Sequence, residues 1–189
     1  MQTTALTGAF AEPPVGAAQG FRAALGAMAR PGRIETVKGA SAPAPVSPAA
    51  AVLLLTLCDR ETPLYLAPGH DGVEIRDWIA FHTGAPIVAP GQAQFALGRW
   101  PALQPLSAYR LGTADYPDRS ATLIVEMDTL SAEGARLTGP GVETEAFLSL
   151  PETSAFRANR ALFPLGFDTF FTCDDRLAAL PRSTIVEDA

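Results

Sequence analysis

The clearest hydrophobic pattern near the start of the chain is a helical one over residues 17–30. Its apolar positions fall at i, i+3, i+4 and i+7, and they are Phe21, Ala24, Leu25 and Met28. This spacing predicts an amphipathic helix that buries these four side chains and ends at the Pro31-Gly32 pair. Arg22, Gly26 and Arg30 share another face of the same helix, which we expect to be exposed to water.

Two further helices carry start signals of their own. The dipeptide Ser47-Pro48 is typical of a capped helix start, and the apolar residues 49–58 that follow predict the helix itself. Asp71, with Glu74 three residues later, has the pattern of a capping box, and Gly84 marks the end of that helix. Its apolar stripe consists of Ile75, Trp78, Ile79 and His82.

Short segments rich in β-forming residues alternate with these helices. They are residues 33–38, 63–66, 92–98, 121–127, 136–138, 145–150 and 169–173, and a fourth helix is expected over 151–162. The alternation predicts the α/β class, as a three-layer α/β/α arrangement around a mostly parallel or mixed sheet. The length predicts one domain over residues 1–189, with a core at about 16–186 and peripheral ends at 1–15 and 187–189.

Charged side chains are few. They make up 18% of the chain, against about 25% in ordinary domains, while 48% of the residues are apolar. We therefore expect a partner-covered face, and a homodimer when the chain is isolated. The net charge of −6 argues against a nucleic-acid partner. Residues 1–11 lack the pattern of a signal peptide, and the longest apolar run, 49–57, is far shorter than a membrane span, so a cytoplasmic protein that does not bind membranes is expected.

Residues from which catalytic sites are usually built are scarce. The two histidines, His70 and His82, are isolated, and Cys58 and Cys173 are too few for a structural zinc or an iron–sulfur cluster. The chain contains neither a phosphate-binding glycine motif nor a nucleophile elbow. Its single lysine, Lys38, lacks the neighbouring groups that pyridoxal phosphate requires. We therefore expect no catalytic, cofactor-binding or metal-ligating residue.

Several charged positions leave alternatives open. Arg22, Arg30 and Arg33 lie close together around the end of the first helix. Such guanidinium groups can clamp a phosphate or phosphonate, anchor a protein interface, or simply favour the helix dipole from the surface. His82 is either a semi-buried capping residue or a general acid or base. Glu126, which ends an apolar strand, either reaches water or faces a cleft.

Short motifs occur in a fixed order along the chain. They are residues 21–22 (FR), 27–32 (AMARPG), 53–57 (LLLTL), 62–66 (TPLYL), 81–86 (FHTGAP), 112–113 (GT), 121–124 (ATLI), 137–141 (LTGPG), 163–168 (FPLGFD), 172–173 (TC) and 180–184 (LPRST). Together they span residues 21–184, and they resemble the PhnH family, a subunit of the bacterial carbon–phosphorus (C–P) lyase core complex.

This resemblance implies a fold like the large domain of pyridoxal-phosphate-dependent transferases, without that cofactor. It also implies an accessory, non-catalytic role in phosphonate catabolism, where the complex transfers phosphonate to the ribose of ATP with loss of adenine. The implied partners are the subunits PhnG, PhnI and PhnJ, and no catalytic residue carries over. The alternative is a stand-alone enzyme acting on a nucleotide or phosphonate through His82 and an Arg30/Arg33 anion clamp, which would require these three side chains to converge in one cleft.

Overall fold

The computed structural model describes residues 6–188, while residues 1–5 and 189, which belong to the ends expected to be peripheral, lie outside the described residues. The helices are α1 (Pro13–Ala29), α2 (Pro48–Leu57), α3 (Val73–His82) and α4 (Thr153–Ala161). The strands are β1 (Glu35–Thr36), β2 (Leu64–Leu66), β3 (Phe95–Arg99), β4 (Thr122–Glu126), β5 (Ala135–Thr138), β6 (Ala146–Leu148), β7 (Asp168–Cys173), β8 (Arg176–Leu180) and β9 (Ile185–Glu187).

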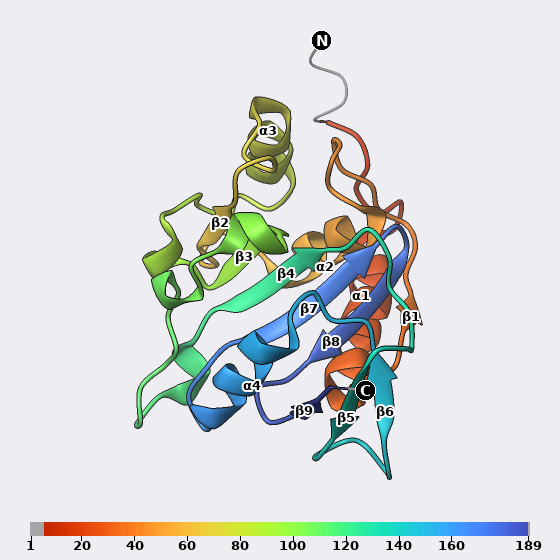
Figure 1. Ribbon diagram of the computed structural model, residues 1–189. Coiled ribbons are helices and arrows are strands. Elements are labelled where there is room, and N and C mark those ends of the chain that lie inside the picture. Colours follow the sequence, from red (N-terminus) through yellow and green to blue (C-terminus); the bar gives the residue numbers. More distant parts are fainter. Residues whose placement is uncertain (1–5, 189) are drawn as a thin grey trace.

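A six-stranded mixed sheet forms the centre of the molecule (Figure 1), in the order β1-β8-β7-β4-β3-β2. Strands β2, β3, β4 and β7 run parallel to one another. Strands β8 and β1 continue the sheet in antiparallel pairing beyond β7. The α/β class and the mixed sheet predicted from the alternation of elements are confirmed.

Both faces of this sheet are covered (Figure 1). On one face, Ile124 of β4 and Phe170 of β7 pack in a core with residues of α1, α2 and α3. On the other, Leu123 and Phe171 pack in a second core with Phe156 of α4. Successive strand residues point to opposite faces, so the consecutive residues Leu123, Ile124 and Val125 of β4 must all be apolar to fill both cores. This explains the almost uniformly apolar segment at 121–127.

Helix α2 begins where the sequence predicts it. The Ser47 hydroxyl accepts a hydrogen bond from the backbone N–H of Ala50 at 3.1 Å, and Pro48 occupies the first helical position. Residues 49–54 of this helix are completely buried, because α2 packs against both the sheet and α1. A helix enclosed in this way has no need of a polar face.

Helix α1 differs from its prediction in both extent and orientation. It begins at Pro13, four residues early, which is possible because proline fits the first helical turn. Half of the predicted apolar stripe is wrong: Phe21 and Leu25 are 54% and 57% exposed, whereas Ala24 is buried and Met28 packs against the core. The buried residues are the small ones, Gly20, Ala24 and Ala27.

Close packing between α1 and α2 explains this orientation. A Cβ atom on Gly20 would lie 2.5 Å from the Thr56 hydroxyl oxygen and 2.9 Å from a methyl group of Val52. Only small side chains fit such a close approach of two helices. Phe21 and Leu25 are consequently turned outward.

The predicted capping box of α3 is also wrong. The helix begins at Val73, and its N-cap residue, Gly72, has no side chain with which to cap it. Asp71 instead pairs with Arg76, one of whose guanidinium nitrogens donates to the Asp71 carboxylate at 2.9 Å. The buried stripe of Ile75, Trp78 and Ile79 is confirmed.

Two strands were not predicted, β8 and β9. Asp174, with a φ of 51°, turns the chain tightly after β7, so residues 174–176 lead directly into β8. The alanine-rich sequence 177–180 carries no alternation typical of a strand, and its pairing with β7 decides its conformation. Strand β9 joins β5 and β6 in a separate antiparallel sheet, in the order β6-β5-β9, that lies beside α4 and the C-terminal end of α1 (Figure 1).

Candidate functional site

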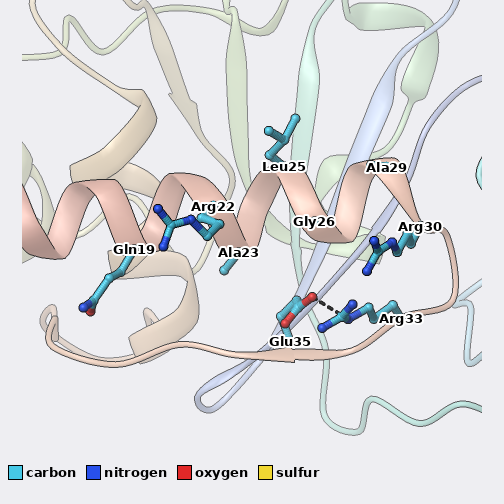
Figure 2. A pocket seen from close by; sticks show the side chains of 9 residues that line it. All are labelled: Gln19, Arg22, Ala23, Leu25, Gly26, Ala29, Arg30, Arg33 and Glu35. Carbon is cyan, nitrogen blue, oxygen red and sulfur yellow. Dashed lines mark ion pairs between the residues drawn. The ribbon is translucent and has the colours of Figure 1, made fainter.

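The outward face of α1 and the turn that follows it bring together the arginines singled out in the sequence (Figure 2). We call this the α1 surface, and it consists of Phe21, Arg22, Leu25, Arg30 and Arg33. Beside it, a groove of about 480 Å³ runs between α1 and the chain around β1. The groove is lined by Gln19, Arg22, Ala23, Leu25, Gly26, Ala29, Arg30, Arg33 and Glu35.

Gly26 of α1 keeps this groove open because it has no side chain. A Cβ atom on Gly26 would lie 3.2 Å from a carboxylate oxygen of Glu35, on the opposite wall. Arg33 forms an ion pair with Glu35, at 2.6 Å between Nε and Oε1 (Figure 2). Within residues 6–188, neither Arg22 nor Arg30 has an ion pair with a carboxylate. The groove therefore carries a net positive charge in a chain whose total charge is −6.

His82 does not join this cluster. Its Nε2 atom lies 3.2 Å from the carbonyl oxygen of Thr7, and its ring packs against those of Trp78 and Phe81. The C-terminal end of α1 lies at the opposite end of the molecule, where Gly32 contacts Ala146 of β6 (Figure 1). The structure thus brings the arginines together but leaves His82 outside, so the convergence that a stand-alone enzyme would require is not present.

Glu126 is buried rather than exposed at its strand end. Only 7% of it is accessible. Its two carboxylate oxygens accept hydrogen bonds from the backbone N–H of Ser47 at 2.7 Å and from the Thr172 hydroxyl at 2.9 Å. Burial raises the pKa of the Glu126 carboxyl, and these hydrogen bonds partly oppose that shift. The carboxylate therefore anchors the start of α2 to the sheet.

Two shallow cavities lie beside Glu126 at the carboxyl ends of the parallel strands, the edge where α/β sheets commonly bind ligands. They measure about 460 and 370 Å³, and both are lined by Arg99, Glu126, Met127 and Asp128. Arg99 and Asp128 are themselves paired at 2.7 Å. Because Arg99 and Asp128 pair with each other and Glu126 is hydrogen-bonded to Ser47 and Thr172, this edge offers a ligand fewer free partners than the α1 surface does.

The remaining candidates occupy unremarkable positions. His70 is only 2% exposed, and neither ring nitrogen has a hydrogen-bond partner within the described chain. Burial, with a smaller contribution from the charge of Arg99, lowers the pKa of His70, which favours the neutral ring. Burial raises the pKa of the Cys58 thiol to about 12, which makes it unreactive at neutral pH. Cys173 is partly buried, and Lys38 is exposed beyond β1.

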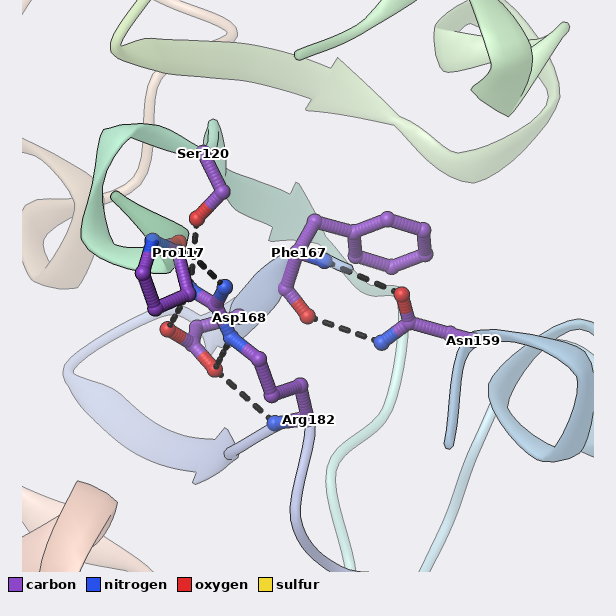
Figure 3. Close-up of polar contacts among 6 residues, drawn as sticks. All are labelled: Pro117, Ser120, Asn159, Phe167, Asp168 and Arg182. Atoms are coloured by element: carbon purple, nitrogen blue, oxygen red, sulfur yellow. Dashed lines mark hydrogen bonds and ion pairs between the residues drawn. The ribbon is translucent and has the colours of Figure 1, made fainter. Parts of the chain in front are cut away.

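Sequence reasoning missed a polar network built around Arg182 (Figure 3). Its guanidinium donates to a carboxylate oxygen of Asp168 at 2.6 Å, to the Ser120 hydroxyl, and to the carbonyl oxygen of Pro117 at 2.8 Å. The backbone N–H of Arg182 also donates to Asp168, at 2.8 Å. Only 12% of the Arg182 side chain is exposed. The network fastens the starts of β4 and β7 to the loop before β9.

A second pair of hydrogen bonds supports the same region. The Asn159 side chain of α4 donates to the carbonyl oxygen of Phe167 at 2.8 Å and accepts from its N–H at 3.0 Å (Figure 3). Through the bonds between Arg182 and Asp168, the two motif segments 163–168 and 180–184 meet in space. No pattern in the local sequence predicts this contact. The signal that points to it is the presence of both segments among the ordered motifs.

Among residues 6–188, no three His, Cys, Asp or Glu side chains lie close enough together to hold a metal ion. None of the helices described is both long and apolar enough to cross a membrane.

Comparison with known proteins places these features in context. A family model described as "Bacterial phosphonate metabolism protein (PhnH)" matches residues 8–187. A relative from Rhizobium meliloti (strain 1021), the alpha-D-ribose 1-methylphosphonate 5-triphosphate synthase subunit PhnH, is 37% identical over 195 residues, which cover 98% of each chain. Both similarities extend over the α1 surface and the Arg182 network.

Proposed function

The chain belongs to the PhnH family, and on that premise we propose that it is an accessory subunit of the C–P lyase core complex in phosphonate catabolism. In this role it supports the transfer of phosphonate to the ribose of ATP with loss of adenine. The observation that carries the proposal is the similarity, along nearly the whole chain, to a named synthase subunit. We propose a cytoplasmic location, where ATP is available.

The proposed partners are the sister subunits PhnG, PhnI and PhnJ, with a homodimer when the chain is isolated. Surface composition supports an assembled state, because large apolar side chains are exposed in several places while charged residues are few. They include Val73 and Phe81 on α3, and Phe21 and Leu25 on α1. Permanent subunit interfaces commonly cover side chains of this kind.

We further propose that the fold is related to the large domain of pyridoxal-phosphate-dependent transferases without retaining their cofactor. The absence of the cofactor is supported by the sheet edge at which α/β proteins commonly bind ligands. Glu126 lies at this edge, and its carboxylate is engaged in anchoring α2. The only lysine, Lys38, lies past β1 at the other side of the sheet from β2 and β3. A purified chain is therefore expected to show no aldimine absorbance with pyridoxal phosphate.

Growth on methylphosphonate as the sole phosphorus source tests the accessory role. Deleting the gene from its bacterium should abolish growth, and expressing the chain should restore it, while growth on inorganic phosphate stays normal. The purified chain alone should release no adenine from ATP, whereas the purified complex with methylphosphonate should. Adenine release by the isolated chain would contradict the proposal, and so would normal growth of the deletion strain on methylphosphonate.

A further inference from the structure

We propose that the α1 surface docks an acidic segment of a different subunit, whose carboxylates pair with Arg22 and Arg30 and whose apolar side chains cover Phe21 and Leu25. This inference rests on the proposed function, because it assumes that the chain works within an assembly. It adds the site of contact and the chemistry of the partner.

Within residues 6–188, the apolar part of the α1 surface is largely uncovered, since Phe21 and Leu25 are 54% and 57% exposed. Phe21 and Leu25 are one helical turn apart and therefore lie on the same side of α1. They cannot turn inward, because the opposite side of α1 packs closely on α2 through Gly20 and other small residues. An exposed aromatic beside arginines has the composition of an interface hot spot.

The charged part of the surface is equally unsatisfied. Arg22 and Arg30 extend from α1 beside the groove (Figure 2), and neither forms an ion pair within residues 6–188. The single carboxylate of the groove, Glu35, is engaged by Arg33. Guanidinium groups form strong paired hydrogen bonds with carboxylates, so acidic side chains are the complementary partners. The groove of about 480 Å³ has room for side chains from such a segment.

A second copy of the same chain does not fit this surface. A two-fold axis places the same surface on both sides of an interface. An axis through the middle of α1 would bring the two copies of Arg22 next to each other, where like charges repel. Only Arg30 would then find a carboxylate, that of Glu12 at the far end of the partner's helix. The homodimer proposed above is accordingly expected to use another face.

Co-expression with the three sister subunits tests the inference. The tagged chain is captured and the retained subunits are quantified by native mass spectrometry. The variants are Arg22→Glu/Arg30→Glu and, for the apolar part, Phe21→Ser/Leu25→Ser. The matched control for the charge reversal is Arg60→Glu/Arg119→Glu, which changes two exposed arginines outside the α1 surface in the same way. Thermal unfolding followed by circular dichroism verifies that each protein is folded.

We expect each α1-surface variant to retain at least about tenfold less of the sister subunits than wild type does, while the arginine control retains them fully. If a charge-reversal variant fails to fold, Arg22→Gln/Arg30→Gln should give a smaller loss of the same kind. Retention should also fall as the salt concentration rises, less steeply in the glutamine variant.

Other outcomes would overturn the inference in recognisable ways. If the α1-surface variants retain the subunits as wild type does, the inference is wrong and the proposed function stands. If wild type retains no subunit, both are wrong. Calorimetric titration with inorganic phosphate addresses a small anion as the occupant: binding abolished by Arg22→Glu/Arg30→Glu, with subunits still retained, would replace the inference with an anion site. Loss of the homodimer alone in that variant would identify a second copy as the occupant.

Discussion

Two groups of arginines in this protein illustrate opposite uses of the same side chain. In the Arg182 network, a largely buried guanidinium finds Asp168, Ser120 and the Pro117 carbonyl group within its own chain. On the α1 surface, Arg22 and Arg30 are exposed and unpaired within the described residues. An arginine whose hydrogen bonds are satisfied internally stabilises a fold, whereas exposed arginines beside uncovered apolar residues are available to a partner.

The largest expected effect concerns the internal group. Replacing Arg182 by Met should lower the free energy of unfolding by about 2–4 kcal/mol, because it leaves the Asp168 carboxylate partly buried without its partner. Urea denaturation followed by circular dichroism measures this change. Arg22→Met, which removes the same group from the α1 surface, is the control and should cost less than about 0.5 kcal/mol. Equal losses in both variants would remove the distinction between the two groups.

The next effect tests why Phe21 and Leu25 of α1 face outward. Gly20→Leu should lower the free energy of unfolding by about 1–3 kcal/mol, because the new side chain has no room against Thr56 and Val52. Ala18→Leu adds the same bulk on the exposed side of the helix and should change stability by less than about 0.5 kcal/mol. A Gly20→Leu protein as stable as wild type would show that close packing does not set the orientation of α1.

His70 sharpens the comparison as a third case, a polar group that is buried without a partner. Its pKa is lowered in the folded protein, so the unfolded chain binds more protons once the pH falls through the ordinary histidine pKa of about 6.5. Stability from this residue is thus present above that pH and is lost as the pH falls toward the lowered pKa. The slope is at most about 1.4 kcal/mol per pH unit.

Urea denaturation between pH 5 and 8 measures this slope in wild type and in His70→Leu. We expect the difference between the two curves to change below about pH 6.5, with wild type losing more stability. Glu126, whose raised pKa acts in the opposite direction, is present in both proteins and cancels in the difference. Parallel curves across the range would contradict a buried, neutral His70.

The smallest expected effect on the free energy of unfolding comes from changing the exposed arginines, Arg22 and Arg30, alone. Arg22→Gln/Arg30→Gln should leave the free energy of unfolding within about 0.5 kcal/mol of wild type, because neither residue supports the fold through an ion pair in the described chain. The same denaturation series measures it. A loss of 2 kcal/mol or more, on the order expected for a buried pair, would mean that these arginines stabilise the fold and would weaken their assignment to a partner.

The candidate site was predictable only in part. The spacing of Arg22, Arg30 and Arg33 around the end of a helix was enough to expect them together, because residues near a helix end and its turn stay close in any fold. The position of His82 relative to these arginines could not be predicted, since His82 lies on α3 and the distance between α3 and α1 depends on packing. The Arg182 network joins three segments, around residues 117–120, 168 and 182, and no local pattern connects them.

The sequence by itself determined the α/β class, the α2 start at Ser47, the buried stripe of α3 and most strands, because caps and periodicity act over only a few residues. It also carried the motifs of the PhnH family. The tertiary structure decided which side of α1 is buried, because hydrophobicity favours Phe21 and Leu25 while the narrow space beside α2 admits only Gly20 and the alanines. Packing against a neighbouring helix depends on shape, and shape is set by residues far away along the chain.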